Sequence, residues 1–200
     1  MPIDFRLSAR RACPPRSRGG FTLIELLVVI FIGSVLAATA MIAMPGVIRA
    51  SKADGEMNRM VSALKRARDF AVTQRRNVLL QFPSANSMQL VRQDIGAGGA
   101  LSGSTVLEQV TFENRFVYQL LPGVGDTPDA FGASSARDFG SAISVMFTSE
   151  GGLVDQTGDP VNGTIFIGAD TDVLSARAAT VLGTTGLVTG YRWNGRQWVK

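Results

Sequence analysis

The sequence offers few of the side chains that catalyse reactions. It contains no histidine, which is the commonest general base and a common metal ligand in proteins. Its one cysteine, Cys13, lies in an arginine-rich stretch near the N-terminus, so no disulfide can form within one chain. Serines are plentiful, but no histidine is present to activate them. We therefore expect no catalytic residues, no metal site and no cofactor.

One acidic residue stands in an unusual place. From Phe21 to Met44 the chain reads FTLIELLVVIFIGSVLAATAMIAM, and Glu25 is the only charged residue in these 24 positions. A carboxylate in a lipid-embedded helix costs about 3 kcal/mol near the bilayer centre and less near its edge. Because of this cost, a carboxylate in a membrane segment indicates a function and requires a partner.

The apolar segment that carries Glu25 is long enough to cross a membrane. As a helix, its 24 residues would extend about 36 Å, against about 30 Å for the hydrocarbon core of a bilayer. Five basic residues precede it, namely Arg6, Arg10, Arg11, Arg16 and Arg18. The positive-inside tendency therefore predicts that residues 1–20 are cytoplasmic and that the chain after Met44 lies outside.

Two ordinary targeting segments are alternatives. A secretory signal peptide has an apolar stretch of about 7–15 residues with a small-residue cleavage site after it. Here the apolar run is longer and the small pair Gly19-Gly20 comes before it, although cleavage within residues 37–40 is conceivable. A plain single-pass anchor would account for the apolar run but would leave Glu25 unexplained.

The order of residues around Glu25 resembles the class III signal of type IV prepilins and type II secretion pseudopilins. Residues 20–25 read Gly-Phe-Thr-Leu-Ile-Glu and are followed by the apolar residues 26–30. The resemblance implies cleavage between Gly20 and Phe21 by a prepilin peptidase, and N-methylation of the new Phe21 amine by the same enzyme. It also implies that Glu25 forms an assembly salt bridge with the N-terminal ammonium of a neighbouring subunit.

Loss of residues 1–20 would remove the basic character of the chain. The full sequence has a net charge of +4, and the first 20 residues hold five of its 20 basic residues but only one acidic residue, Asp4. The remainder has 15 basic and 15 acidic residues, a net charge of zero. Attraction to nucleic acid would then have to come from a local patch.

A second helical stretch is predicted over residues 45–76. Proline in a helix removes one hydrogen bond and clashes with the preceding turn, so Pro45 and Gly46 predict a kink, with termination of the helix as the alternative. Apolar residues then recur at steps of three and four, which is typical of an amphipathic helix that packs on a globular head. These residues are Ile48, Met57, Met60, Val61, Leu64, Ala67, Phe70 and Ala71.

From residue 77 onward, short β-rich runs are bounded by turn residues. The runs are 77–82, 87–92, 115–121, 142–148, 163–168, 177–182 and 187–193. Their close spacing favours antiparallel hairpins in a β-meander, with residues 96–103 and 122–140 as surface loops. We therefore expect an α+β fold, in which a long N-terminal helix, transmembrane in its first half, packs on an antiparallel β-sheet head.

The predicted parts of the chain are a basic leader peptide (1–20), a transmembrane and filament-core helix (21–44), its amphipathic continuation (45–76) and a β-rich head (77–200). The head resembles the GspH/FimT subgroup of pseudopilins and minor pilins in residues 61–72, 143–147, 163–167 and 183–193. This resemblance implies a non-catalytic assembly subunit in the inner membrane, with a periplasmic head. Its partners would be other pilin or pseudopilin subunits and membrane lipid, in either a pilus or a secretion machine.

DNA binding during uptake is the alternative function. Some FimT members bind DNA through a Gly-Arg-x-Arg motif, but residues 186–189 here read Gly-Leu-Val-Thr and lack both arginines. Cations and aromatic residues that could hold single-stranded nucleic acid by charge and stacking come later. They are Arg192, Trp193, Arg196, Trp198 and Lys200. A final hairpin with an Asn194-Gly195 turn and tryptophans packed on the sheet is the competing interpretation.

Overall fold

The computed structural model describes residues 20–96, 100–113 and 115–200. The chain divides into two compact units, residues 1–44 and 45–200, and each is described by itself. The helix α1 (Leu23–Gln74) contributes to both units. All strands belong to the second unit, which we call the head.

The strands of the head differ in length and are named here in chain order. They are β1 (Val78–Ser84), β2 (Ser87–Ile95), β3 (Leu101–Thr111), β4 (Phe116–Tyr118), β5 (Arg137–Asp138), β6 (Val145–Phe147), β7 (Leu153–Val154), β8 (Gly163–Ala169), β9 (Arg177–Leu182), β10 (Leu187–Trp193) and β11 (Trp198–Val199). A 3₁₀ turn, η1 (Val173–Ser175), connects β8 to β9.

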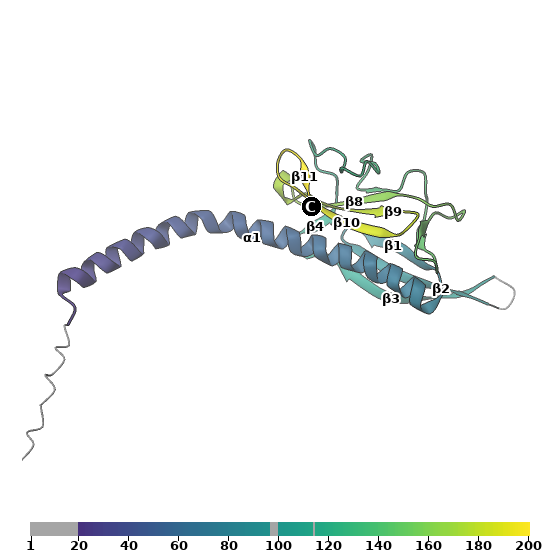
Figure 1. The fold of residues 1–200 in the computed structure, drawn as a ribbon, viewed down its shortest axis with the longest axis horizontal. Helices are drawn as coiled ribbons and strands as arrows, with labels where there is room; N and C mark the ends of the chain where they lie inside the picture. Colours follow the sequence, from purple (N-terminus) through teal and green to yellow (C-terminus); the bar gives the residue numbers. More distant parts are fainter. Residues whose placement is uncertain (1–19, 97–99, 114) are drawn as a thin grey trace, which may run out of the picture. The chain divides into compact units, whose positions relative to one another are not determined.

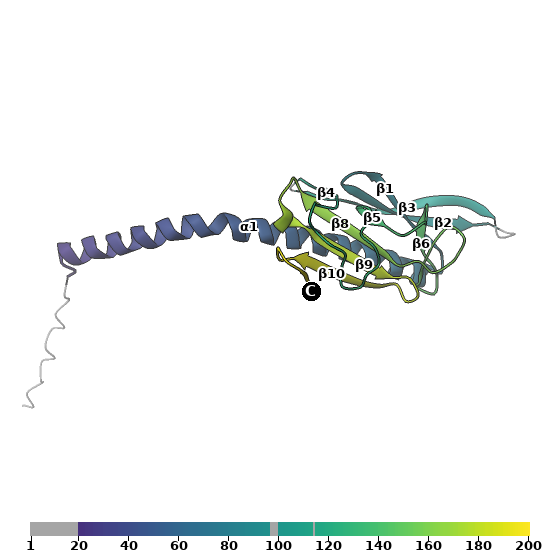
Figure 2. The ribbon, with the colours of Figure 1, turned by 90° about the horizontal axis from the view of Figure 1, so that it is seen from above.

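These strands form two antiparallel sheets (Figures 1 and 2). The first sheet has the order β3-β2-β1-β6-β7, and the second has the order β11-β10-β9-β8-β4, with β5 also pairing with β8. The predicted α+β class and the antiparallel pairing are confirmed. The chain is not one simple meander, however, because β6 and β7 return to the first sheet after β4 and β5 have joined the second.

One buried cluster joins the helix to both sheets. It contains Met60 and Leu64 of α1, Leu80 of the first sheet, and Ile165 and Val181 of the second. The helix buries mainly small side chains elsewhere, which are Ala53, Ala63, Ala67 and Ala71. Its approach to β10 is so close that a Cβ on Gly190 would lie 3.2 Å from Val61 Cγ2. This core lies wholly within residues 45–200.

Most of the apolar face predicted for the helix is buried or half-buried. Ile48 is the exception, with 48% of its surface exposed. The first buried helical residue is Ala53, so Ile48 precedes the part of α1 that the head covers. The helix continues through Pro45 and Gly46 and is not terminated there. The kink at this point stays a prediction.

The C-terminus of the helix lies at Gln74, two residues before the predicted limit. Arg75 adopts a left-handed backbone with φ of 51°, and Arg76 N donates to Ala71 O over 3.2 Å. This is the six-to-one hydrogen bond of a Schellman motif, which normally has glycine at the left-handed position. The sequence gives no warning of this end, because arginine occupies the position where glycine would have marked it.

The strand β3 was missed by the sequence analysis, and the predicted loop at 96–103 is wrong where it overlaps β3. Residues 97–99 of that loop lie outside the described residues. β3 pairs with β2 from Ser87↔Thr111 to Ile95↔Leu101. Its first six residues are all exposed, so it lacks the alternation of buried and exposed positions by which strands are recognised.

The predicted surface loop at 122–140 is anchored on the second sheet. Within and beside it, Leu121, Val124 and Thr127 are buried. Trp198 Nε1 donates to Gly125 O over 2.8 Å. Asp129 accepts hydrogen bonds from Thr180 Oγ1 at 2.6 Å and from the Tyr191 hydroxyl at 2.9 Å. Residues 137–138 form β5. The segment therefore forms part of the head's packed structure.

Candidate functional site

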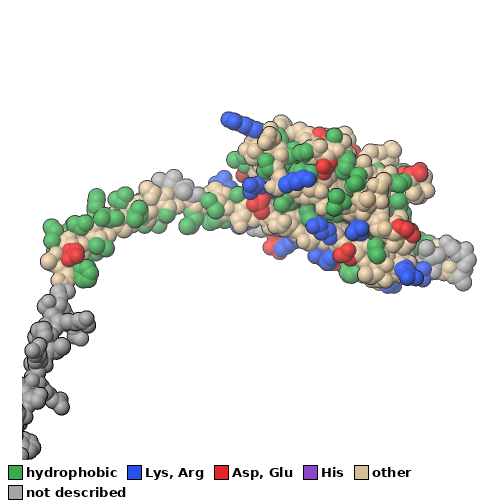
Figure 3. Space-filling model, in the orientation of Figure 1, with side chains coloured by type: hydrophobic (Ala, Val, Ile, Leu, Met, Phe, Trp, Pro, Cys, Tyr) green, Lys and Arg blue, Asp and Glu red, His purple; other side chains and the backbone are tan. Residues whose placement is uncertain are grey.

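The first part of α1 is apolar and exposed. Residues Leu23–Met41 have a mean hydropathy of 2.5, and none of this 19-residue stretch is buried by the rest of the protein. Figure 3 shows hydrophobic side chains along this part of the helix. Nineteen residues of helix extend about 28 Å, close to the thickness of a bilayer core. By length and composition this stretch could span a membrane.

Two hydroxyl groups inside the apolar stretch are satisfied by the helix itself. Ser34 Oγ donates to Phe31 O over 2.8 Å, and Thr39 Oγ1 donates to Leu36 O over 2.9 Å. Such hydroxyls need no external partner in a lipid or protein interior. Glu25 is therefore the polar side chain of this stretch that still needs one.

The N-terminus of α1 has a cap that the sequence analysis did not identify. Thr22 Oγ1 accepts a hydrogen bond from Glu25 N over 3.2 Å, and Thr22 O accepts one from Leu26 N. Thr22 and Glu25 have the spacing of a capping box, in which threonine at the N-cap precedes glutamate at the third helical position. The Thr-x-x-Glu pattern in the sequence could have revealed it.

Glu25 is exposed in the isolated chain, and no hydrogen bond or ion pair to its carboxylate is found among the described residues. Its place in the first turn is electrostatically favourable, because the helix dipole is positive at this end. A cation from outside the chain could approach it without displacing any described partner. The geometry therefore leaves Glu25 available for an intermolecular contact.

The predicted cleavage point lies just outside the helix. Gly20 and Phe21 are exposed and precede the first helical residue, Leu23. Phe21 exposes 79% of its surface. A peptide bond outside regular structure can enter a protease site without local unfolding, whereas a helical bond cannot.

The predicted C-terminal hairpin is present. Strands β10 and β11 pair through Arg192↔Val199 and Trp193↔Trp198. The loop between them has four residues instead of two, and Asn194 Oδ1 closes it by accepting hydrogen bonds from the backbone N–H groups of Arg196 and Gln197 at 2.9 Å.

The five residues considered for nucleic-acid contact do not form one accessible surface. Trp198 is 6% exposed, stacks at an angle on Phe166 with ring centroids 5.8 Å apart, and packs edge-on against the half-buried Trp193. Arg192, Arg196 and Lys200 are exposed. The three cationic side chains therefore lie in solvent, whereas the Trp198 side chain is buried against the second sheet.

Within the described residues, no group of three or more histidine, cysteine, aspartate or glutamate residues could hold a metal ion.

Comparison with known proteins identifies the N-terminal segment. Residues 15–41 match the family model of the prokaryotic N-terminal methylation motif. A search of curated proteins gives no match to this chain.

Two crystal structures of the type IV minor pilin FimU from Pseudomonas aeruginosa are similar to the chain. One has 17% sequence identity and a TM-score of 0.46, and the match covers 70% of this chain and 87% of FimU. The other crystal form has 17% identity and a TM-score of 0.44, over 68% and 90% of the two chains. This likeness is too distant to assign a function. The methylation motif confirms the prepilin-type signal predicted from Gly20 to Glu25.

Proposed function

We propose that this chain is a structural and assembly subunit of a type IV pilus-like filament or of a type II secretion pseudopilus. In this proposal a prepilin peptidase cleaves between Gly20 and Phe21 and methylates the Phe21 amine. The inner membrane holds the helix before assembly, with the head in the periplasm. The observation that carries the proposal is the exposed carboxylate of Glu25 inside the apolar stretch, which no described residue pairs with and which lies within the matched methylation motif.

The proposed role of Glu25 is to fix the axial position of neighbouring subunits. When apolar helices pack side by side, dispersion and apolar contacts alone allow several axial positions with similar energies. A buried carboxylate is strongly unfavourable unless a cation meets it, so only the position that brings an ammonium group to Glu25 is stable. The methylated amine of Phe21 in the adjacent subunit remains protonated and can supply this charge.

The test replaces the charge while retaining the helix cap. The capping bond runs from the backbone N–H of residue 25 to Thr22 Oγ1, so Glu25→Gln removes the negative charge and leaves this bond in place. We expect this variant to be inserted and cleaved normally but to enter filaments poorly, as measured by immunoblotting sheared filaments against the membrane fraction. Normal incorporation of Glu25→Gln would refute the role of the charge.

Thr22→Ala is the matched control. It removes the capping oxygen and leaves the carboxylate, at a cost of about 1 kcal/mol of local helix stability. We expect this variant to assemble much better than Glu25→Gln. If Thr22→Ala failed as completely as Glu25→Gln, assembly would be sensitive to any change in the first helical turn, and the failure of Glu25→Gln would no longer support an intermolecular ion pair.

Cleavage is tested separately at Gly20. A bulky substitution, Gly20→Val, should block peptidase access and leave the longer form in the membrane, visible as a size difference on an immunoblot against the C-terminus. Mass spectrometry of the wild-type product should find an N-methylated phenylalanine at its N-terminus. A product that retained residues 1–20, or lost the apolar helix, would contradict the proposal.

DNA uptake is not favoured as a second function. Trp198 is committed to the second sheet, and the arginine positions of the known DNA-binding motif hold Leu187 and Thr189 here. The exposed cations alone would give weak, salt-sensitive binding.

A further inference from the structure

A groove of about 420 Å³ opens in the head beside β1. One wall is the second half of β1, and the other is the chain that leads from β5 into β6. Its lining is mostly apolar and includes Phe82, Phe139 and Ile143. Ile143 exposes 91% of its surface, the largest exposed fraction among the big hydrophobic residues described in the head. A single exposed apolar side chain is ordinary on a protein surface, but at the rim of an apolar groove Ile143 extends the apolar area that a bound segment could cover.

The groove also borders the end of β1 that extends beyond its pairing with β6. Gln93 N donates to Asn77 O, so the backbone groups of Asn77, Leu79 and Gln81 face β2, and those of the alternate residues face β6. Pairing with β6 ends at Leu80↔Val145.

The next backbone groups on this side belong to Phe82, and no described strand pairs with them there. The residue that would continue β6, Ile143, turns its N–H to Gln156 Oε1 instead, at 3.0 Å. Alternation along β1 as far as Gln81 would turn the Phe82 N–H and C=O toward the groove, at the start of the register shift between Gln81 and Ser84.

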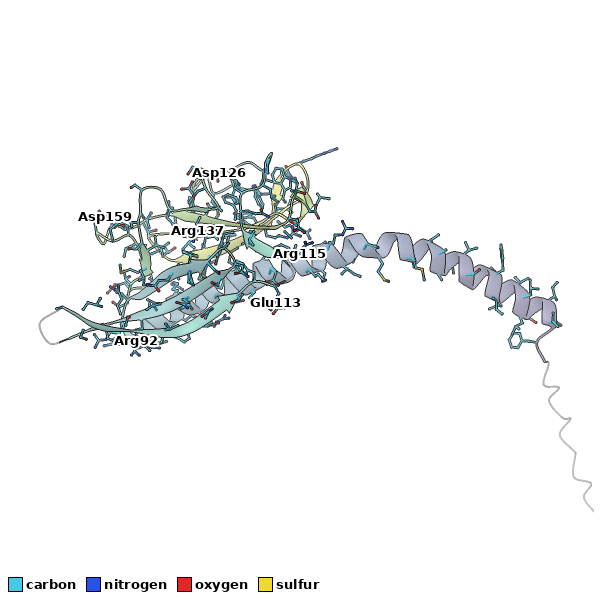
Figure 4. All side chains as sticks on the ribbon, turned by 180° about the vertical axis from the view of Figure 1, so that it is seen from behind. Arg92, Glu113, Arg115, Asp126, Arg137 and Asp159 are labelled. Carbon is cyan, nitrogen blue, oxygen red and sulfur yellow. The ribbon has the colours of Figure 1, made fainter. Side chains whose placement is uncertain are left out.

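Arg137 supplies a positive charge at the same place. Its guanidinium lies over the Phe82 ring, 5.0 Å from the centroid, and 5.5 Å from the centroid of Tyr118. Arg137, which Figure 4 labels, is exposed and has no ion pair within the described part of the chain. Stacking on aromatic rings fixes the plane of the guanidinium and leaves its in-plane N–H groups available for a carboxylate.

We propose that this groove binds a short extended segment of a partner protein that carries an acidic residue beside apolar ones. The segment pairs its backbone with Phe82, packs an apolar side chain against Ile143 and Phe139, and places its carboxylate on Arg137. Addition of an extended segment to an open sheet edge is a common mode of peptide recognition. The positive charge of Arg137 selects an acidic segment over a neutral or basic one.

The test measures binding of defined peptides to the full-length chain in detergent micelles by calorimetry. The probe is the end-blocked peptide Thr-Val-Glu-Val-Thr, compared with the same peptide containing glutamine for glutamate and with a version N-methylated on alternate amides. We expect saturable binding of the acidic peptide and about tenfold weaker binding of the glutamine peptide, since a hydrogen bond to a charged group is lost. The N-methylated peptide should not bind, because it cannot pair as a strand.

Variants of the chain locate the site. Arg137→Gln and Ile143→Ser should each weaken binding of the acidic peptide about tenfold, and Arg137→Lys should have an intermediate effect because it keeps the charge but loses the planar fork. Arg196→Gln and Leu174→Ser change an exposed arginine and an exposed leucine outside the groove and should bind normally. Unchanged tryptophan fluorescence would show that each variant is folded.

Several outcomes would overturn the proposal. They are no binding of the acidic peptide, equal binding of all three peptides, or equal binding by the groove variants and their controls. Concentration-dependent dimers of the chain that Ile143→Ser abolishes would instead identify a second copy as the occupant. None of these outcomes involves Glu25, so the groove and the proposed assembly function can fail independently.

Discussion

Arg177 Nε donates to Asp54 Oδ1 over 2.8 Å and thereby connects β9 to α1. The guanidinium is nearly inaccessible, with 3% of its side chain exposed, and its Nη1 also donates to the carbonyl oxygens of Leu174 and Ala176. The carboxylate and the two carbonyl oxygens compensate for the hydration that the buried guanidinium loses. Removing the carboxylate would leave the guanidinium charge uncompensated, which lowers the stability of the fold. This ion pair therefore holds the helix on the second sheet.

Removal of the carboxylate by Asp54→Ala should lower the free energy of unfolding by about 2 kcal/mol. This is below the usual cost of breaking a buried pair because Asp54 is 34% exposed. The measurement is urea unfolding of the full chain in micelles, followed by the fluorescence of Trp193 and Trp198. Arg115→Gln breaks the exposed pair with Asp170 and should cost less than about 1 kcal/mol. Equal effects of the two variants would contradict a special role for Arg177.

Asp138 should make the head sensitive to acid. Burial by itself would raise the pKa of its carboxyl, but hydrogen bonds outweigh burial and lower it. The donors are Ser134 N and Oγ, both at 2.7 Å, and Gly140 N at 3.0 Å. Because the folded pKa is below the unfolded value of about 3.9, this contribution is present at neutral pH and is lost as the pH falls through the folded pKa.

Asp138→Asn should therefore destabilise the head at pH 7 and flatten the acid side of the curve of stability against pH. Asparagine would turn an NH₂ group toward at least one of the same donors. Thermal unfolding across the acidic range measures this, and Asp69→Asn, at an exposed helical position, is the control. A wild-type steepness in the Asp138→Asn curve would show that another carboxylate causes the acid loss.

Tyr191 should limit stability at alkaline pH. Burial, followed by the hydrogen bond from its hydroxyl to Asp129 Oδ1 at 2.9 Å, raises the pKa of Tyr191 to about 12. A raised folded pKa means that the contribution is complete below the unfolded pKa of about 10 and is lost as the pH rises toward 12. Tyr191→Phe should reduce this alkaline loss, measured by unfolding at increasing pH. An unchanged profile would exclude Tyr191 as its source.

Gly186 cannot be replaced without strain. Its φ is +62°, and a Cβ there would overlap the carbonyl oxygen of Gly151. Gly158 also has a positive φ, +92°, but has open space around the corresponding position. Gly158→Ala should cost about 1–2 kcal/mol for the left-handed backbone alone. Gly186→Ala should cost clearly more, and similar unfolding midpoints for the two variants would contradict the close contact with Gly151.

The fold could be predicted only in part, and β3 and the Arg177–Asp54 pair illustrate the reason. β3 is a strand because β2 supplies its hydrogen bonds, whereas its own residues from Leu101 to Val106 carry no alternating pattern. Asp54 and Arg177 are 123 residues apart in the chain, and nothing in the residues around either one indicates the other. Such pairings depend on which strands come together, a property of the whole head.

The sequence alone determined the N-terminal segment of this protein. Its apolar length, its single carboxylate at Glu25 and its Thr22 cap act within a few residues of one helix, so local physics defines them. Tertiary structure decided the division of strands between two sheets, the anchoring of residues 122–140 and the groove beside Arg137. Each of these features depends on contacts between segments that are far apart in the sequence. Such contacts contribute to stability only when folding has brought the segments together and excluded water from between them.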